Sequence, residues 1–187
     1  MGRIEKLVER YTRYIALPWQ KDLAGAQRAI FVVYDKKDER RLRARLELFE
    51  LATKGTGHGW KACDLTTAFS TWMSGIDYRD EYFDDPSSLE MKLEEDFLEY
   101  VAQQIQEALT AADVDDQTIV GVYGLASLYG YVRTSEVMAK IEKSIRGRLA
   151  VLFPGEYENN NYRLLDARDG WNYHAIPITL HQELYEP

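Results

Sequence analysis

The sequence contains a single cysteine, Cys63, among its 187 residues, so no disulfide can form within the chain. Cysteine this scarce is typical of proteins that work in a reducing compartment. The sequence also lacks the run of roughly 18 apolar residues that a membrane-spanning helix needs. Charged and apolar residues alternate in the first 19 positions, which is unlike a secretory signal peptide. We therefore expect a cytoplasmic protein without a membrane segment.

Basic residues are in the minority. The chain has 23 Lys and Arg against 31 Asp and Glu, and its net charge is −8. Binding to duplex nucleic acid relies on cations that neutralise phosphates, so direct nucleic-acid binding is not expected. The Arg-rich stretch at 40–45 is a local exception and keeps DNA contact open as a minor possibility. Asp38, Glu39 and Glu47 lie around it, which favours a solvated helix face.

Residue patterns for catalysis or metal binding are missing. His58, His174 and His181 are scattered without an HExxH or HxxxH pair, and the single Cys63 is best interpreted as a buried thiol. The chain has no GxSxG, GxxxxGK[ST] or GxGxxG motif. Glu90-Met91-Lys92 matches half of a nuclease motif, but successive helix positions would not converge on one metal. We predict no catalytic residue, no metal and no cofactor, and hence a protein that is not an enzyme.

Alternating strand and helix patterns predict the fold. The apolar runs at 29–34, 118–124 and 149–153 lack period-two alternation, which is typical of strands buried on both faces. Helical spacing and strand composition predict the other elements: helices at 3–16, 36–55 and 87–112, a helical piece around Phe69–Met73, a helix from about 134, and strands at 60–65, 161–167 and 172–178. The result is one α/β domain over 1–187, with three layers and a mostly parallel central sheet flanked by helices. The last two strands are separated only by the turn at 167–170 and predict an antiparallel edge hairpin at the C-terminus.

The acidic and aromatic segment 75–86 is predicted to be a solvated loop. Ser87 and Glu90 form a capping-box pattern at the start of the helix that follows. From Leu89 to Ala112 this helix keeps one apolar face for about seven turns.

Ligands of open α/β sheets bind beyond the carboxyl ends of the strands, so the loop at 121–135 is the best ligand candidate. It contains Gly121, Gly124 and Gly130 and leads into a helix at Arg133-Thr134-Ser135. Exposed amides and Arg133 are suited to hold a phosphate or nucleotide there. Its leucines and tyrosines favour structural packing instead, and both interpretations stay open. The GTGHG segment at 55–59 precedes a strand, so it is interpreted as a helix-to-strand connection.

Aromatic side chains offer a second kind of site. Exposed Tyr, Trp and Arg are enriched at protein interfaces because they bury a large area at low entropic cost. The loops around 123–135 and 155–173 are therefore expected to bind a partner protein. The candidate partner-binding residues are Tyr129, Arg133, Tyr157, Arg168, Trp171 and Tyr173. A structural role for the aromatic turn, sealing the end of the sheet, is equally open.

Residues 118–179 resemble the BrxB family of bacterial BREX phage-defence systems. The likeness rests on TIVGVYGLASLYGYVRTS at 118–135, LFPGEY at 152–157 and YRLLDARDGWNY at 162–173. It implies a small cytoplasmic accessory subunit without known enzymatic activity. It also implies that the subunit works together with an alkaline-phosphatase-like PglZ protein, and near the DNA methyltransferase and the large ATPase of the system. The resemblance and the aromatic loops together predict a subunit that acts by binding the PglZ-like partner.

Overall fold

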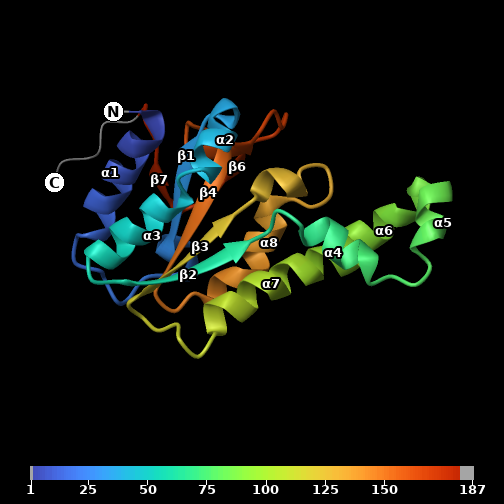
Figure 1. Cartoon of the computed structure of the whole chain (residues 1–187), viewed down its shortest axis with the longest axis horizontal. Coiled ribbons are helices and arrows are strands. Elements are labelled where there is room, and N and C mark those ends of the chain that lie inside the picture. Colours follow the sequence, from blue (N-terminus) through green and yellow to red (C-terminus); the bar gives the residue numbers. More distant parts are fainter. Residues whose placement is uncertain (1, 182–187) are drawn as a thin grey trace.

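The computed structural model describes residues 2–181, in which a seven-stranded sheet lies between two helical layers (Figure 1). The strands are β1 (Ala29–Tyr34), β2 (Gly59–Asp64), β3 (Thr118–Tyr123), β4 (Arg148–Glu158), β5 (Asn161–Leu164), β6 (Trp171–Asn172) and β7 (Ile176–Ile178). The α-helices are α1 (Arg3–Ile15), α2 (Glu39–Arg43), α3 (Leu46–Gly55), α4 (Ala68–Ser74), α5 (Arg79–Asp84), α6 (Glu90–Lys92), α7 (Leu98–Thr110) and α8 (Thr134–Ile141). Short 3-10 helices span Gly25–Arg28, Lys36–Asp38, Pro86–Leu89, Leu125–Leu128 and Glu142–Ser144, and a π-helical segment spans Leu93–Phe97.

The main sheet has the strand order β2-β3-β4-β1-β7, and all of these strands run parallel. This confirms the predicted α/β class and the mostly parallel sheet. Strand β1 lies inside the sheet, with Ala29 opposite Leu149 of β4 and Ile30 opposite Ile176 of β7. All six residues of β1 are buried, which explains why its sequence is apolar without alternation.

Alternate side chains of β1 enter two separate cores. Phe31 faces the layer that contains α7 and α8 and belongs to the same core cluster as Val101 and Ile141. Ile30 faces the opposite layer and belongs to the same core cluster as Leu7 of α1 and Phe49 of α3. Burial of both faces gives the predicted three-layer arrangement.

The predicted helix at 36–55 is interrupted. A 3-10 turn and α2 come first, and α3 begins only at Leu46 after a break at 44–45. The predicted stop at Gly55 is confirmed as the last residue of α3.

An antiparallel hairpin is present near the C-terminus, as predicted, but it is built differently. Strand β4 continues beyond the parallel sheet and turns through Asn159 and Asn160, whose φ angles are 50° and 62°. Asparagine tolerates this left-handed backbone, which a tight hairpin turn requires. Strand β5 then pairs antiparallel with both β4 and β6. The single strand expected over 172–178 is two strands, because β7 returns to the parallel sheet and covers the edge of β1.

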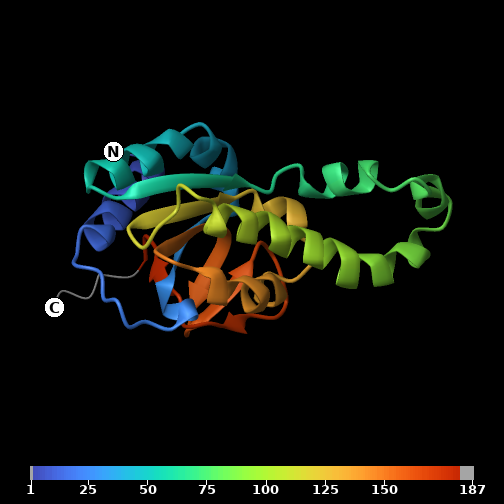
Figure 2. The ribbon, with the colours of Figure 1, turned by 90° about the horizontal axis from the view of Figure 1, so that it is seen from below.

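Residues 75–97, called the arm below, project from the body of the molecule together with α4 (Figures 1 and 2). The solvated loop predicted at 75–86 was wrong, because α5 forms within it. The predicted capping box is also wrong. Asp85 caps the next turn instead, accepting hydrogen bonds from the backbone N of Ser87 at 3.2 Å and from its Oγ at 2.5 Å. The continuous helix expected from 87 is divided by the π-helical segment before α7.

Candidate functional site

Two hollows lie on either side of the β4–β5 hairpin, at the carboxyl ends of the strands. The larger has a volume of about 650 Å³ and is lined by residues 35–38 after β1 and 155–159 at the end of β4. The segments that follow β1 and β4 pack on opposite faces of the sheet, because Leu42 and Phe49 belong to one core cluster and Tyr162 to the other. Such a switch point is where open α/β sheets usually bind ligands.

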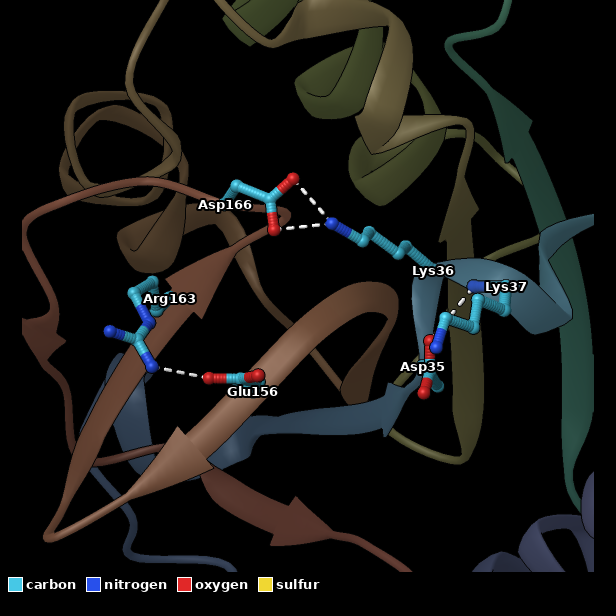
Figure 3. Close-up of polar contacts among 6 residues, drawn as sticks. All are labelled: Asp35, Lys36, Lys37, Glu156, Arg163 and Asp166. Atoms are coloured by element: carbon cyan, nitrogen blue, oxygen red, sulfur yellow. Dashed lines mark hydrogen bonds and ion pairs between the residues drawn. The ribbon is translucent and has the colours of Figure 1, made fainter.

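Ion pairs and hydrogen bonds neutralise most of the charges around this switch-point hollow (Figure 3). Lys36 pairs with Asp166, and Arg163 pairs with Glu156. The Asp35 carboxylate accepts a hydrogen bond of 2.9 Å from the backbone N of Lys37, and this bond lowers the pKa of Asp35. Asp35, Lys37 and Glu158 also line the hollow and make no ion pair within residues 2–181, so these three charges stay available to a ligand.

The second hollow, called the pocket below, has a volume of about 360 Å³. One wall is the loop at 129–135 and the other is the turn at 167–171, with β4 and β5 beneath them. The pocket brings together four of the six predicted partner-binding residues: Tyr129, Arg133, Arg168 and Trp171. The structure thus joins two loops that the sequence indicated separately.

A cluster of aromatic rings supports the pocket. Phe31 of β1 lies 4.7 Å from the Tyr162 ring and 5.8 Å from the Trp171 ring, measured between centroids. The Tyr162 hydroxyl donates a hydrogen bond of 2.9 Å to the carbonyl of Ala175. Burial raises the pKa of Tyr162, so its hydroxyl stays protonated and holds this bond. The hairpin is thereby fixed on the sheet as a rigid wall.

Two free guanidinium groups are found on the pocket. Arg133 and Arg168 are both exposed, and within residues 2–181 neither side chain makes an ion pair or a hydrogen bond. Arg133 directly precedes α8, and Arg168 lies in the turn before β6. A guanidinium binds carboxylate or phosphate through two parallel hydrogen bonds, so the pocket is suited to an anionic group.

Tyr157 and Tyr173, the other two predicted residues, lie outside the pocket. Tyr157 borders the switch-point hollow and donates a hydrogen bond of 3.0 Å to Asn160. Tyr173 stacks on Trp171 with ring centroids 4.4 Å apart and donates to Glu142 at 3.1 Å. Burial raises the pKa of Tyr173. Tyr173 therefore supports the pocket wall from behind.

The glycines of the 121–135 segment do not form a common anion cradle. Gly121 is buried inside β3, where a Cβ atom would lie 2.0 Å from the Trp60 ring. Gly124 adopts a φ of 86° and lies against Thr66. Only Gly130 of these three glycines lines the pocket. Much of the segment is packing, as Leu125 and Leu128 are buried.

Other candidates for chemistry have structural environments. Burial raises the pKa of the Cys63 thiol from 9.0 to about 12, so it is a poor nucleophile near neutral pH. His58 stacks on Trp19 with centroids 3.8 Å apart, in the connection between α3 and β2. His174 is exposed between β6 and β7, and His181 borders the switch-point hollow.

No cluster of three or more His, Cys, Asp or Glu side chains suited to a metal occurs in residues 2–181.

Three arginines of the stretch at 40–45 pair with carboxylates: Arg41 with Asp38, Arg43 with Glu39 and Arg45 with Glu5. These pairs support the interpretation of a solvated helix face. Among the described helices, none has the length and apolar character needed to cross a bilayer.

The fold and the pocket define a class of α/β protein with a concave site at the carboxyl ends of its strands. The family model described as BREX protein BrxB matches residues 78–178, which is more than half of the chain. The chain therefore belongs to the BrxB family, whose members are components of BREX phage-defence systems. The matched residues include most of the arm and the whole pocket. No curated protein and no solved structure matches the chain.

Proposed function

We propose that this protein is a non-catalytic, cytoplasmic accessory subunit of a BREX complex that acts by binding a PglZ-like protein of the alkaline-phosphatase superfamily. The observation that carries the proposal is the convergence of Arg133 and Arg168 on one pocket, with both guanidinium groups free of partners in the described chain. The residues that line the pocket all lie within the stretch that the family model matches.

The chemistry of the pocket suits a protein partner. Arginine and tryptophan are enriched among the residues that dominate interface energies, and Trp171 lines the pocket together with both arginines and contacts Phe31 of the aromatic cluster. A hollow of about 360 Å³ is large enough for one or two side chains. An Asp or Glu of the partner would pair with the guanidinium groups, while an apolar neighbour would contact Trp171.

The test is a binding measurement with the purified PglZ-like protein of the same BREX system. Arg133→Ala and Arg168→Ala each remove charge-assisted hydrogen bonds of about 1.5–3 kcal/mol, so each variant should bind roughly 10–100-fold more weakly. Both side chains are exposed, so the melting temperature should stay close to that of the wild type. Arg40→Ala is the matched control, since Arg40 is also exposed and its side chain makes no ion pair or hydrogen bond within residues 2–181.

Two results would overturn the proposal. One is the absence of a complex with the PglZ-like protein at micromolar concentration on size exclusion. The other is a complex whose affinity is the same for Arg133→Ala, Arg168→Ala and Arg40→Ala.

A second candidate function uses the same two arginines. A phosphate or nucleotide would find two unpaired guanidinium groups and an aromatic wall in the pocket. A ligand that binds only the native state raises the melting temperature, so millimolar phosphate, ATP or GTP should stabilise the wild type but not Arg133→Ala. No shift, or an equal shift in both proteins, would remove this candidate.

A further inference from the structure

The arm is the most prominent feature of the molecule that the pocket does not explain. It runs from Gly75 through α5 and α6 to the end of the π-helical segment, and Figures 1 and 2 both show it reaching beyond the sheet and its covering helices. Residues at the tip consequently have few neighbours from the rest of the fold. Of residues 77–88, only Tyr82 is buried.

Most of the net negative charge of the protein lies on this arm. Residues 75–97 contain nine Asp and Glu against two basic residues, a net charge of −7 in a chain whose total is −8. Both basic side chains are engaged locally: Lys92 pairs with Asp96 at 2.6 Å, and Arg79 donates to the carbonyl of Ser74 at 3.2 Å. Within residues 2–181, seven of the nine carboxylates make no ion pair or side-chain hydrogen bond: Asp77, Asp80, Glu81, Asp84, Glu90, Glu94 and Glu95.

Large apolar side chains lie exposed among these carboxylates. Met91 is 68% exposed and Phe83 is 65% exposed, the two highest values among the large hydrophobic residues described as exposed. Tyr78 is 50% exposed and contacts Tyr82 edge-on. Exposed aromatic and methionine side chains within a charged rim are characteristic of protein interfaces.

The arm is firmly attached to the body. Phe97, at the end of the π-helical segment, is fully buried and contacts Trp72 and Phe69 of α4 at centroid distances of 5.1 and 5.5 Å. The last residue of the arm is thus packed against α4, the helix that directly precedes the arm. An arm fixed in this way presents its tip with little loss of conformational entropy on binding.

The charge of the arm selects among classes of partner. Nucleic acid and anionic membrane surfaces carry negative charge and would be repelled. A second copy of this chain offers Lys6 of α1 and Arg40 of α2, which make no ion pair within residues 2–181, whereas Arg3, Arg13, Arg41 and Arg43 already pair with carboxylates of their own chain. A two-fold dimer would require the arm of each copy to contact the body of the other reciprocally.

We propose that the arm is a docking element for a different protein of the same BREX system, one that presents a basic surface with an apolar hollow for Phe83 or Met91. Complementary charge would speed association and align the arm, and the apolar side chains would provide most of the affinity. This contact is separate from the one proposed for the pocket, because Arg133 and Arg168 do not lie on the arm.

The test measures binding of the full-length chain to each of the other proteins of its BREX system, purified separately. Phe83→Ser and Met91→Ser should weaken binding to one of them by at least about 10-fold. Leu51→Ser is the matched control, since Leu51 is 62% exposed on α3. The double variant Asp80→Asn/Asp84→Asn should slow association, whereas Asp22→Asn/Asp116→Asn, with the same charge change on exposed residues of the body, should not.

Salt dependence gives a further check. Affinity of the wild type should fall several-fold between about 50 and 300 mM salt, because solvent-exposed charges are screened. The inference is overturned if no protein of the system binds, if Phe83→Ser and Met91→Ser bind like Leu51→Ser, or if these variants lose only self-association. Loss of binding in Arg133→Ala but not in the arm variants would reject the arm and leave the pocket proposal intact. The reverse pattern would reject the pocket and leave the arm.

Discussion

The ring of Tyr131 stacks on the ring of Phe69, with centroids 4.2 Å apart and planes only 4° from parallel. Tyr131 belongs to the loop that carries Arg133, and Phe69 belongs to α4 at the root of the arm. Phe97 meets both rings edge-on. One aromatic cluster therefore joins the pocket loop to the base of the arm, and a change in it should affect both.

Replacing Tyr131 tests this connection. Tyr131→Ala removes an aromatic contact of about 0.5–1.5 kcal/mol, which should loosen the loop without unfolding the protein, since Tyr131 is 37% exposed. Hydrogen exchange of the amides at 131 and 132, which donate to the Leu128 carbonyl, should become faster. Tyr131→Phe keeps the ring and should exchange like the wild type. Equal exchange in Tyr131→Ala and the wild type would contradict a structural role for the stack.

Gly121 is expected to be required for the packing of Trp60. A Cβ atom at position 121 would lie 2.0 Å from the indole ring, so Gly121→Ala must displace the ring or the strand. Overpacking of this kind costs about 1–3 kcal/mol of unfolding free energy, measurable by urea denaturation. Gly55→Ala is the control because nothing lies within 4 Å of its added Cβ atom. A Trp60→Leu substitution in the Gly121→Ala background should recover part of the loss, and no recovery would mean that the clash lies elsewhere.

Sequence patterns were sufficient for the body of the molecule because its strands are buried on both faces. The apolar runs that contain Phe31, Val120 and Val151 have no polar alternation, which few structures other than a covered parallel sheet permit. The C-terminal hairpin was only partly predictable. Its turn residues and strand lengths follow from the local sequence. The pairing of Ile176 with Ile30 is a long-range contact, which no local sequence pattern predicts.

The pocket and the arm show where sequence reasoning stops. The sequence indicates Arg133 and Arg168 separately as interface candidates. They line one pocket only because the extended β4 and the hairpin fold back beside α8. The sequence does not indicate the arm, because α5 has no apolar stripe of helical period and the exposed Phe83 fits the pattern of an irregular loop. A projecting helix needs no buried face, so hydrophobic periodicity cannot reveal it.

The Cys63 thiol gives a prediction for reactivity and pH dependence. Because its pKa is about 12 in the folded protein and 9.0 otherwise, the thiol ionises first in the unfolded state. Stability from this group is fully present below pH 9 and is lost as the pH rises toward 12. Unfolding free energy of the wild type should thus fall more steeply over this range than that of Cys63→Ala. A disulfide reagent at pH 8 should label Cys63 only after denaturant is added, and rapid labelling of the native protein would contradict the buried thiol.

Two aspartates test which ion pairs stabilise the fold. The Asp166 carboxylate pairs with Lys36 across the switch-point hollow, but its side chain is 75% exposed (Figure 3). The Asp38 side chain is only 7% exposed and pairs with Arg3 at 2.9 Å and with Arg41 at 3.2 Å. Water and salt screen the first pair, whereas in the second the carboxylate is buried although Arg3 and Arg41 are 47% and 71% exposed.

We therefore expect Asp166→Asn to change the unfolding free energy by less than about 1 kcal/mol. Asp38→Asn should cost about 1.5–3 kcal/mol, because it removes the charge that two arginines share at the start of α2. Urea denaturation of both variants measures the difference. Repeating it at high salt should shrink the effect of Asp166→Asn more than that of Asp38→Asn. If both substitutions lower the unfolding free energy equally, the burial of the carboxylate does not determine how much these ion pairs stabilise the fold.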